Sequence, residues 1–136
     1  MPIVRSETTY LHAEAIKSMP RNLEIRNNIS IDDVEKSTII ENSNALKISF
    51  NFSSDYNQKS AYLQVKGYVI FIDSSENIEK IEAEWKKNNQ LTQEVMLEVG
   101  NFALMKSQMQ SILLAHELGL QSPVKLPALQ AKSEEA

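Results

Sequence analysis

Hydrophobic and polar residues alternate with a period of two over four segments of the first half of the chain. In the clearest segment, residues 45–53, Lys47, Ser49 and Asn51 separate large apolar side chains. This period places the two kinds of side chain on opposite faces of an extended strand. The strands predicted in this way cover residues 8–16, 23–32, 45–53 and 60–73.

Two residues interrupt these strand patterns. Asn27 lies on the apolar face shared by Ile25 and Ile29, which predicts a β-bulge near Asn27 and Asn28. Gly67 lies within the fourth segment and predicts either a bulge or a close approach of another backbone. Both irregularities are expected inside the sheet rather than at its ends.

Polar runs predict where the second and third strands end. Asp32 and Asp33 are expected to form a turn, and residues 54–58 a polar connection. Residues 68–72 of the fourth strand are apolar on both faces. A strand of this kind is covered on both sides, so we expect a helix on one side and a second cover on the other.

The period changes to a helical one after Asp73. Asp73 and Glu76 have the spacing of a capping box. Ile78, Ile81 and Trp85 then recur at helical spacing among glutamates and lysines, which predicts a short amphipathic helix. Two consecutive asparagines at residues 88–89 are expected to end it.

A long helix is predicted for residues 93–118, with Thr92 as its N-cap and Gly119 as its stop. Its apolar arc is wider than one face of a sheet requires, since two apolar stripes run along it. The excess predicts a homo-oligomer, a peptide groove, or both. The stripes consist of Val95, Val99, Phe102, Met109 and Leu113, and of Met96, Ala103, Leu114 and Leu118.

The segment after the long helix, residues 120–129, contains two prolines and alternating apolar residues. It is expected to be extended and to lie on the body of the domain, whereas residues 130–136 are expected to be disordered. The fold class predicted is α+β, with a four-stranded antiparallel sheet followed by a short and a long C-terminal helix in two layers. Residues 1–129 form one domain in this interpretation.

Composition narrows the classes of function. The 136-residue chain has a net charge of −4 and a pI of about 5.2, which argues against nucleic acid as a partner. It contains no cysteine, so disulfides and cysteine-based zinc sites are excluded. No apolar run is long enough for a membrane helix, and residues 1–9 lack the apolar core of a signal peptide, so we expect a cytoplasmic protein without membrane insertion.

No motif in the sequence predicts catalysis, a cofactor or a metal site. The two histidines, His12 and His116, lie on different elements without a second ligand at suitable spacing. The three glycines are isolated and form no phosphate-binding loop. An enzyme remains an open alternative, in which His12, Glu14 and Tyr68 share one strand period in a sheet-and-helix pocket.

The order of these elements resembles that of the SecB family of export chaperones. Residues 10–16 resemble its first strand and residues 45–52 its third. Residues 61–71, with the sequence AYLQVKGYVIF, resemble its fourth, and residues 120–129, LQSPVKLPAL, its proline-containing apolar end. The chain is also similar to uncharacterised archaeal SecB-like proteins, in which a Trp-Lys-Lys helix precedes a long helix.

This resemblance implies a non-enzymatic, ATP-independent holdase that binds unfolded or extended polypeptides, with a homo-oligomeric assembly and a possible role in protein export. The alternative is an adaptor or subunit of a larger complex that binds one specific protein partner. Methionines favour adaptable binding surfaces, although they also fill cores. The residues proposed for peptide binding are Phe50, Phe52, Tyr62, Tyr68, Ile70, Met105, Met109, Leu113 and Leu126.

Overall fold

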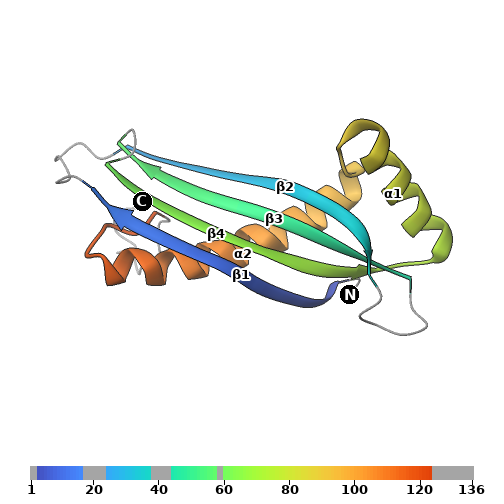
Figure 1. Ribbon diagram of the computed structural model, residues 1–136, viewed down its shortest axis with the longest axis horizontal. Coiled ribbons are helices and arrows are strands. Elements are labelled where there is room, and N and C mark those ends of the chain that lie inside the picture. Colours follow the sequence, from blue (N-terminus) through green and yellow to red (C-terminus); the bar gives the residue numbers. More distant parts are fainter. Residues whose placement is uncertain (1–2, 17–23, 38–43, 58–59, 124–136) are drawn as a thin grey trace, which may run out of the picture.

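The computed structural model describes residues 3–16, 24–37, 44–57 and 60–123, and it has the predicted α+β architecture (Figure 1). Four antiparallel strands form one sheet in the order β1-β4-β3-β2, so β1 and β2 are its edges. Two helices follow the strands in the chain. The elements are β1 (Ile3–Ala15), β2 (Ile25–Ser37), β3 (Ala45–Tyr56), β4 (Ala61–Ile72), α1 (Ser75–Asn88) and α2 (Gln93–Glu117).

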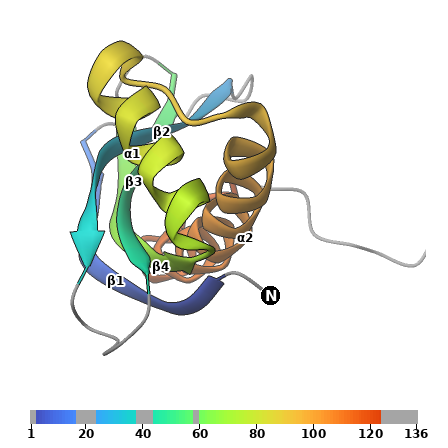
Figure 2. The same cartoon turned by 90° about the vertical axis from the view of Figure 1, so that its right-hand side faces the viewer.

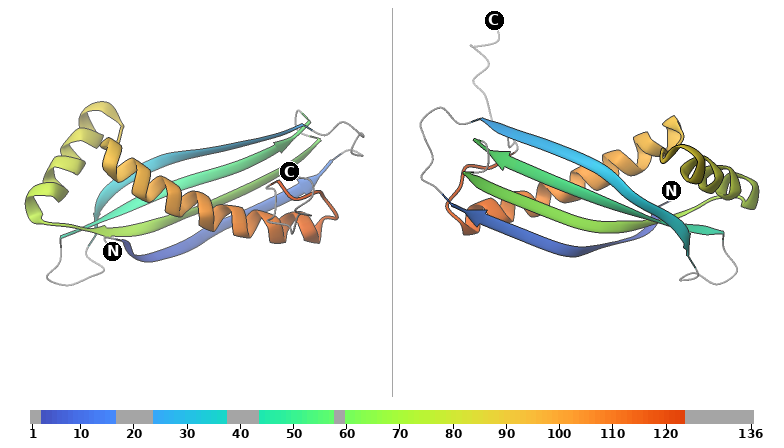
Figure 3. Two further views of the ribbon diagram at one scale, coloured as in Figure 1. Left: turned by 180° about the vertical axis from the view of Figure 1, so that it is seen from behind. Right: turned by 45° about the horizontal axis from the view of Figure 1, so that its top comes forward.

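Both helices lie on the same side of the sheet (Figure 2). The long helix α2 crosses the sheet diagonally, and α1 lies at one end of the sheet, where its Ile78 and Ile81 join the core (Figure 3). Within the described residues no helix covers the opposite face, which is called the open face below. Because α2 crosses at an angle, it leaves part of the helix-side face near β2 for other segments to cover.

The core lies between α2 and the helix-side faces of β3 and β4. Large residues of the sheet, among them Leu46, Phe50 and Val69, are almost completely buried there. Burial of such side chains stabilises a domain by about 1.5–3 kcal/mol each. The residues that α2 buries are mostly small: Val95, Val99, Gly100, Ala103, Ser107, Ser111 and Ala115.

The strands are longer than the alternation predicted. β1 begins at Ile3, and β3 continues to Tyr56, so the polar connection expected at residues 54–58 is wrong for residues 54–56, whereas Asn57 lies in the turn. β2 continues through Asp32 and Asp33 to Ser37, so the turn expected there is also wrong. These polar residues remain in strands because neighbouring strands supply backbone partners along their whole length.

The bulge predicted at Asn27 and Asn28 is also wrong. The pairing of β2 with β3 is unbroken from Ile25 to Ile31 and shifts only between Ile31 and Asp33. Asn27 remains on the helix-side face because its amide is hydrogen-bonded: Ser54 Oγ donates to Asn27 Oδ1 at 2.6 Å. A polar side chain with its own partner does not require a bulge.

At Gly67 the prediction of a close backbone approach is confirmed. A Cβ at this position would overlap the carbonyl oxygen of Glu7 and lie 2.9 Å from Phe50 Cζ. The β1–β4 register shifts opposite it, between Thr8 and Tyr10. Gly67 therefore lets β1 and the Phe50 ring approach the same point of β4.

The helix ends agree with the prediction except at the start of α1. Its N-cap is Ser74, whose Oγ accepts a hydrogen bond from the Asn77 N–H at 3.3 Å, so the box based on Asp73 is wrong by one residue. Asn89 ends α1 in the left-handed conformation with φ 55°. Thr92 occupies the N-cap position of α2 as predicted, but its side chain makes no cap hydrogen bond, and Gly119 follows the helix with φ 66°, as predicted. No helix of the described residues is long and apolar enough to cross a membrane.

Candidate functional site

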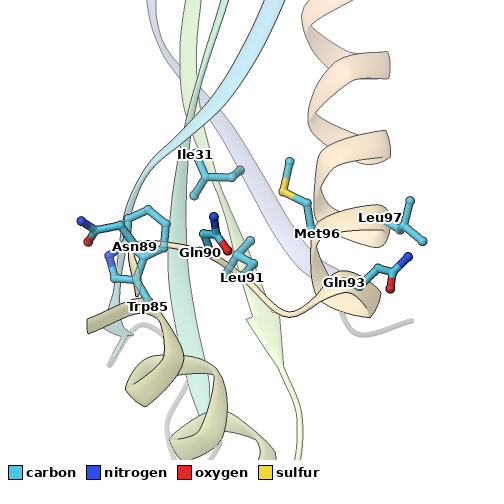
Figure 4. A pocket seen from close by; sticks show the side chains of 8 residues that line it. All are labelled: Ile31, Trp85, Asn89, Gln90, Leu91, Gln93, Met96 and Leu97. Atoms are coloured by element: carbon cyan, nitrogen blue, oxygen red, sulfur yellow. The ribbon is translucent and has the colours of Figure 1, made fainter. Parts of the chain in front are cut away.

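A groove of about 500 Å³ lies where α1, the connection after it, the start of α2 and the edge strand β2 meet (Figure 4). Ile31 comes from the strand, and Trp85 comes from the last turn of α1. No lining side chain carries a charge, so the groove has no group for acid–base chemistry. The lining residues are Ile31, Trp85, Asn89, Gln90, Leu91, Gln93, Met96 and Leu97.

The turn between the helices brings these side chains together. The Asn89 N–H donates to the Trp85 carbonyl at 2.8 Å and closes α1 just after the indole. The chain then passes through Leu91 and re-enters a helix, where the Met96 N–H donates to the Thr92 carbonyl at 2.8 Å. Trp85, Leu91 and Met96 therefore face one another over a short stretch of sequence.

The chemistry of this groove suits an apolar chain with exposed amide groups. An indole, aliphatic side chains and a thioether form its walls, and a thioether adapts to ligands of different shape. The side-chain amides of Asn89, Gln90 and Gln93 line it as well, and each can both donate and accept hydrogen bonds. An apolar floor with a few polar groups beside it is typical of a binding site.

The outer face of α2 carries a row of exposed apolar side chains that begins at this groove. Leu97, Met105, Met109 and Leu113 are 58%, 54%, 63% and 63% exposed. They recur at intervals of four or eight residues, so they lie along one side of the helix. We call Met105, Met109 and Leu113 the outer stripe. It confirms that the apolar arc of the helix is wider than the sheet requires.

The open face of the sheet differs from the groove in that ionisable side chains lie beside its aromatic residues. Tyr10, His12, Glu14 and Tyr62 line a shallow depression of about 400 Å³ near the end of β1. His12 Nε2 lies 3.8 Å from Glu14 Oε2, and the Tyr10 and His12 rings are stacked with centroids 6.3 Å apart. His12 and Glu14 share a face, as the sequence predicted.

Tyr68 lies farther along the same face and has its own partners. Its hydroxyl donates to Glu7 Oε2, and Lys47 Nζ lies 4.7 Å from its ring centroid. The hydrogen bond from Tyr68 and the neighbouring Arg5 lower the pKa of Glu7, and the bond to Glu7 raises the pKa of Tyr68. The pair is therefore held as a neutral phenol and a carboxylate, separate from His12.

The residues predicted to bind peptide lie on different surfaces. Phe50 and Phe52 belong to the core beneath α2 and are at most 1% exposed, so they are not available to a ligand. Tyr62, Tyr68 and Ile70 lie on the open face, where Ile70 is fully buried, as expected for a strand covered on both sides.

The remaining predicted residues belong to α2 and to the segment after it. Met105, Met109 and Leu113 form the outer stripe, whereas Leu126 lies outside the described residues. The groove residues themselves were missed. A usable signal was the single tryptophan beside two asparagines, followed by an isolated Leu91 in a polar connection.

Metal ligands do not gather in the described part of the chain. No group of three or more His, Asp or Glu side chains there is placed to hold a metal ion. The groove and the outer stripe are exposed apolar surfaces of the described residues, and the groove also has neutral amide side chains in its lining.

Comparison with known proteins supports the fold. No family model and no curated protein matches the chain. A solved structure that does match is the SecB-like chaperone Rv1957 of Mycobacterium tuberculosis, in complex with a ChAD peptide from the HigA1 antitoxin Rv1956. The TM-score is 0.57 with 13% identity, over 95% of this chain and 90% of that chain. The protein therefore has a SecB-like fold.

Proposed function

We propose that this protein is a SecB-like holdase that binds unfolded or extended polypeptides without ATP. The observation that carries the proposal is the uncharged apolar groove with neutral amides among its lining side chains. The solved SecB-like chaperone of the same fold holds a peptide, which supports the same class of ligand here. The proposed activity is binding without catalysis, and we propose that the protein acts in the cytoplasm.

Binding would rest on apolar burial and on backbone hydrogen bonds. An extended chain placed beside the edge strand β2 would put alternate side chains against Trp85, Leu91 and Met96. Apolar burial contributes about 25 cal/mol per Å² and offsets part of the entropic cost of binding, and it requires no specific sequence. Asn89, Gln90 and Gln93 would meet the peptide groups, which every client has.

The proposal includes a homo-oligomer formed through the outer stripe. Met105, Met109 and Leu113 expose large apolar side chains in a row. Rows of this kind on a helix mark contact sites more often than solvent-facing surface. The similarity to uncharacterised archaeal SecB-like proteins remains a prediction, as does the role in export.

Light scattering tests the proposal directly. A chemically denatured reporter protein is diluted into buffer with and without this protein at matched subunit concentration. We expect suppressed aggregation in the absence of ATP. Met96→Asp places a charge in the groove and should reduce the suppression about tenfold or more, because an unpaired charge against apolar walls costs several kcal/mol.

Ala83→Asp is the matched control, because Ala83 is exposed on α1 away from the groove. It adds the same charge and should leave the suppression unchanged. If the folded wild-type protein does not suppress aggregation, the holdase proposal is wrong and a dedicated adaptor with one partner is the better description. Circular dichroism confirms that each variant is folded.

A further inference from the structure

The segment after α2 is held by three hydrogen bonds, one to the end of the helix and two to the sheet. The Leu120 N–H donates to the Ala115 carbonyl at 2.8 Å. Tyr56 Oη then donates to the Gln121 carbonyl at 2.6 Å, and Asn27 Nδ2 donates to the Pro123 carbonyl at 3.0 Å. Figure 3 shows this segment turning back against the end of the sheet where β2 begins. We call residues 120–123 the strap.

The buried polar residues beneath the strap are arranged to hold it. Ser54 is fully buried and its Oγ donates to Asn27 Oδ1 at 2.6 Å, which turns the Asn27 NH₂ group toward Pro123. Tyr56 is also fully buried, and burial raises its pKa to about 12. Polar groups placed in a core need partners, and the strap carbonyls supply them. Specific hydrogen bonds from these side chains therefore fix the strap in place.

The direction of the strap follows from the strand register. Tyr56 pairs with Ile25, and Ser54 pairs with Asn27, two residues farther along β2. The strap bonds the first pair through Gln121 and the second through Pro123. The strap therefore runs parallel to β2. It advances two residues while β2 advances two residues, as an extended chain does.

This direction leads to the groove. Ile31 lies four residues beyond Asn27 on the same face of β2, which is about 13 Å at ~3.3 Å per residue. Ile29 lies between Asn27 and Ile31 on this face, and it is partly buried against the core, as is Phe102 of α2. It therefore provides an apolar surface along the path from Asn27 to Ile31. Six residues can span about 20 Å when extended, so residues 124–129 are long enough to extend past Ile31.

The composition of residues 124–129 matches this path. Val124, Leu126 and Leu129 are apolar, and Pro127 favours an extended backbone in the residue before it. Lys125 is the only charged residue of the segment, and the groove itself carries no charge. The segment is therefore similar to the apolar, extended clients that the groove would bind.

We propose that residues 124–129 bind in the groove of their own chain as an internal competitor of polypeptide clients. The competition with clients rests on the proposed function, whereas the placement of the segment rests on the position and direction of the strap. A segment tethered this closely has an effective concentration on the order of millimolar. Clients must displace it, so only chains with several apolar segments would be held firmly.

Trp85 reports on the groove, since it lines the groove and is the only tryptophan of the chain. Leu126→Asp should shift its fluorescence to longer wavelength and increase its quenching by acrylamide. A chain ending after Pro123, which retains the strap, should give the same change. Ser133→Asp adds the same charge outside the apolar segment and should leave the spectrum unchanged.

Competition gives the second readout. A labelled synthetic peptide of residues 120–129 should bind the chain ending after Pro123 at least about tenfold more tightly than the full chain. Equal affinities together with unchanged Trp85 emission would overturn the inference while leaving the holdase proposal intact. A spectral difference that grows with protein concentration would also overturn it, because the segment would then come from a second copy.

The two proposals fail separately. If no form of the protein suppresses aggregation, but Leu126→Asp still changes the emission of Trp85 and Ser133→Asp does not, the holdase function is lost and the internal docking stands. If the chain ending after Pro123 and the full chain suppress aggregation equally and their spectra agree, the docking is lost and the function stands.

Discussion

The inner and outer faces of α2 differ in the size of their side chains. The face against the sheet presents Ala103, Ser107 and Ala115, each at most 1% exposed, whereas Met105 and Met109 on the outer face are more than half exposed. A helix on a single sheet normally has the reverse arrangement, with large apolar side chains inward. In α2 the large apolar side chains therefore lie on the exposed side, where a second copy would cover them if the proposed oligomer forms.

The small inner residues have a structural reason. The sheet already fills the core with aromatic rings, and Tyr56 packs in the same buried cluster as Ala115. A larger helix residue would compete for that volume. Ser111 is satisfied locally, since its Oγ donates to the Ser107 carbonyl at 2.8 Å. Small residues thus bring the helix close to the sheet, and the large ones lie on the exposed side.

The largest effect is expected on the outer face. Replacing Met105, Met109 and Leu113 together with glutamine removes three apolar contacts, each worth about 1.5 kcal/mol if buried between copies. The association constant of the oligomer should fall at least about a hundredfold. Sedimentation velocity over a range of protein concentrations measures this change.

The same triple variant tests whether the outer stripe lies outside the core of the subunit. The unfolding free energy of the isolated subunit should change by less than about 0.5 kcal/mol per site, because exposed positions contribute little. If the subunit instead loses cooperative unfolding, the outer stripe belongs to the core. If the wild-type protein is a monomer at all concentrations, the outer face has no second copy as its partner.

The hydrophobic pattern of the sequence predicted the strands and helices, but not the buried side of α2. Period-two alternation predicted all four strands, and asparagine and glycine marked the ends of the helices correctly. The inward side of α2 could not be predicted, because apolar residues occur all around that helix. Its buried face is marked by alanine and serine, whose small size has no strong signal in a hydrophobic pattern.

The groove was hidden for a different reason. Ile31, Trp85 and Met96 come from three elements, and only the packing of α1 beside β2 brings them together. Similarly, residues 54–56 resembled a polar connection because the partners of Ser54 and Tyr56 lie on β2 and on the strap. Polar residues whose partners are distant in sequence cannot be distinguished from loop residues by local pattern.

A smaller effect is expected on the inner face. Ala103→Leu inserts three carbon atoms where the helix lies closest to the sheet, and should destabilise the domain by about 1–3 kcal/mol. Urea unfolding followed by circular dichroism measures it. Asn101→Leu, at an exposed position two residues away, is the control and should stay within about 0.5 kcal/mol of wild type. Equal losses for both would mean that the two faces are packed alike.

The smallest effect concerns the buried hydroxyl under the end of α2. Tyr56→Phe removes the hydrogen bond to the Gln121 carbonyl and should cost about 1 kcal/mol of unfolding free energy. Burial raises the pKa of Tyr56 to about 12, so the folded state retains its proton after the unfolded state has lost it. This contribution is complete below pH 10 and is lost as the pH rises to about 12.

The pH dependence identifies this residue. The stability difference between wild type and Tyr56→Phe should be constant from neutral pH to about 10 and shrink above it, since phenylalanine does not titrate. Tyr68 also has a raised pKa, but it is present in both proteins and cancels in the difference. Tyr10→Phe, at a 44% exposed position on the open face, is the matched control for the loss of a phenol hydroxyl. If the difference in unfolding free energy between wild type and Tyr56→Phe stays constant through pH 12, the Tyr56 hydroxyl is open to solvent. The C-terminal end of α2 would then not be packed closely on the sheet.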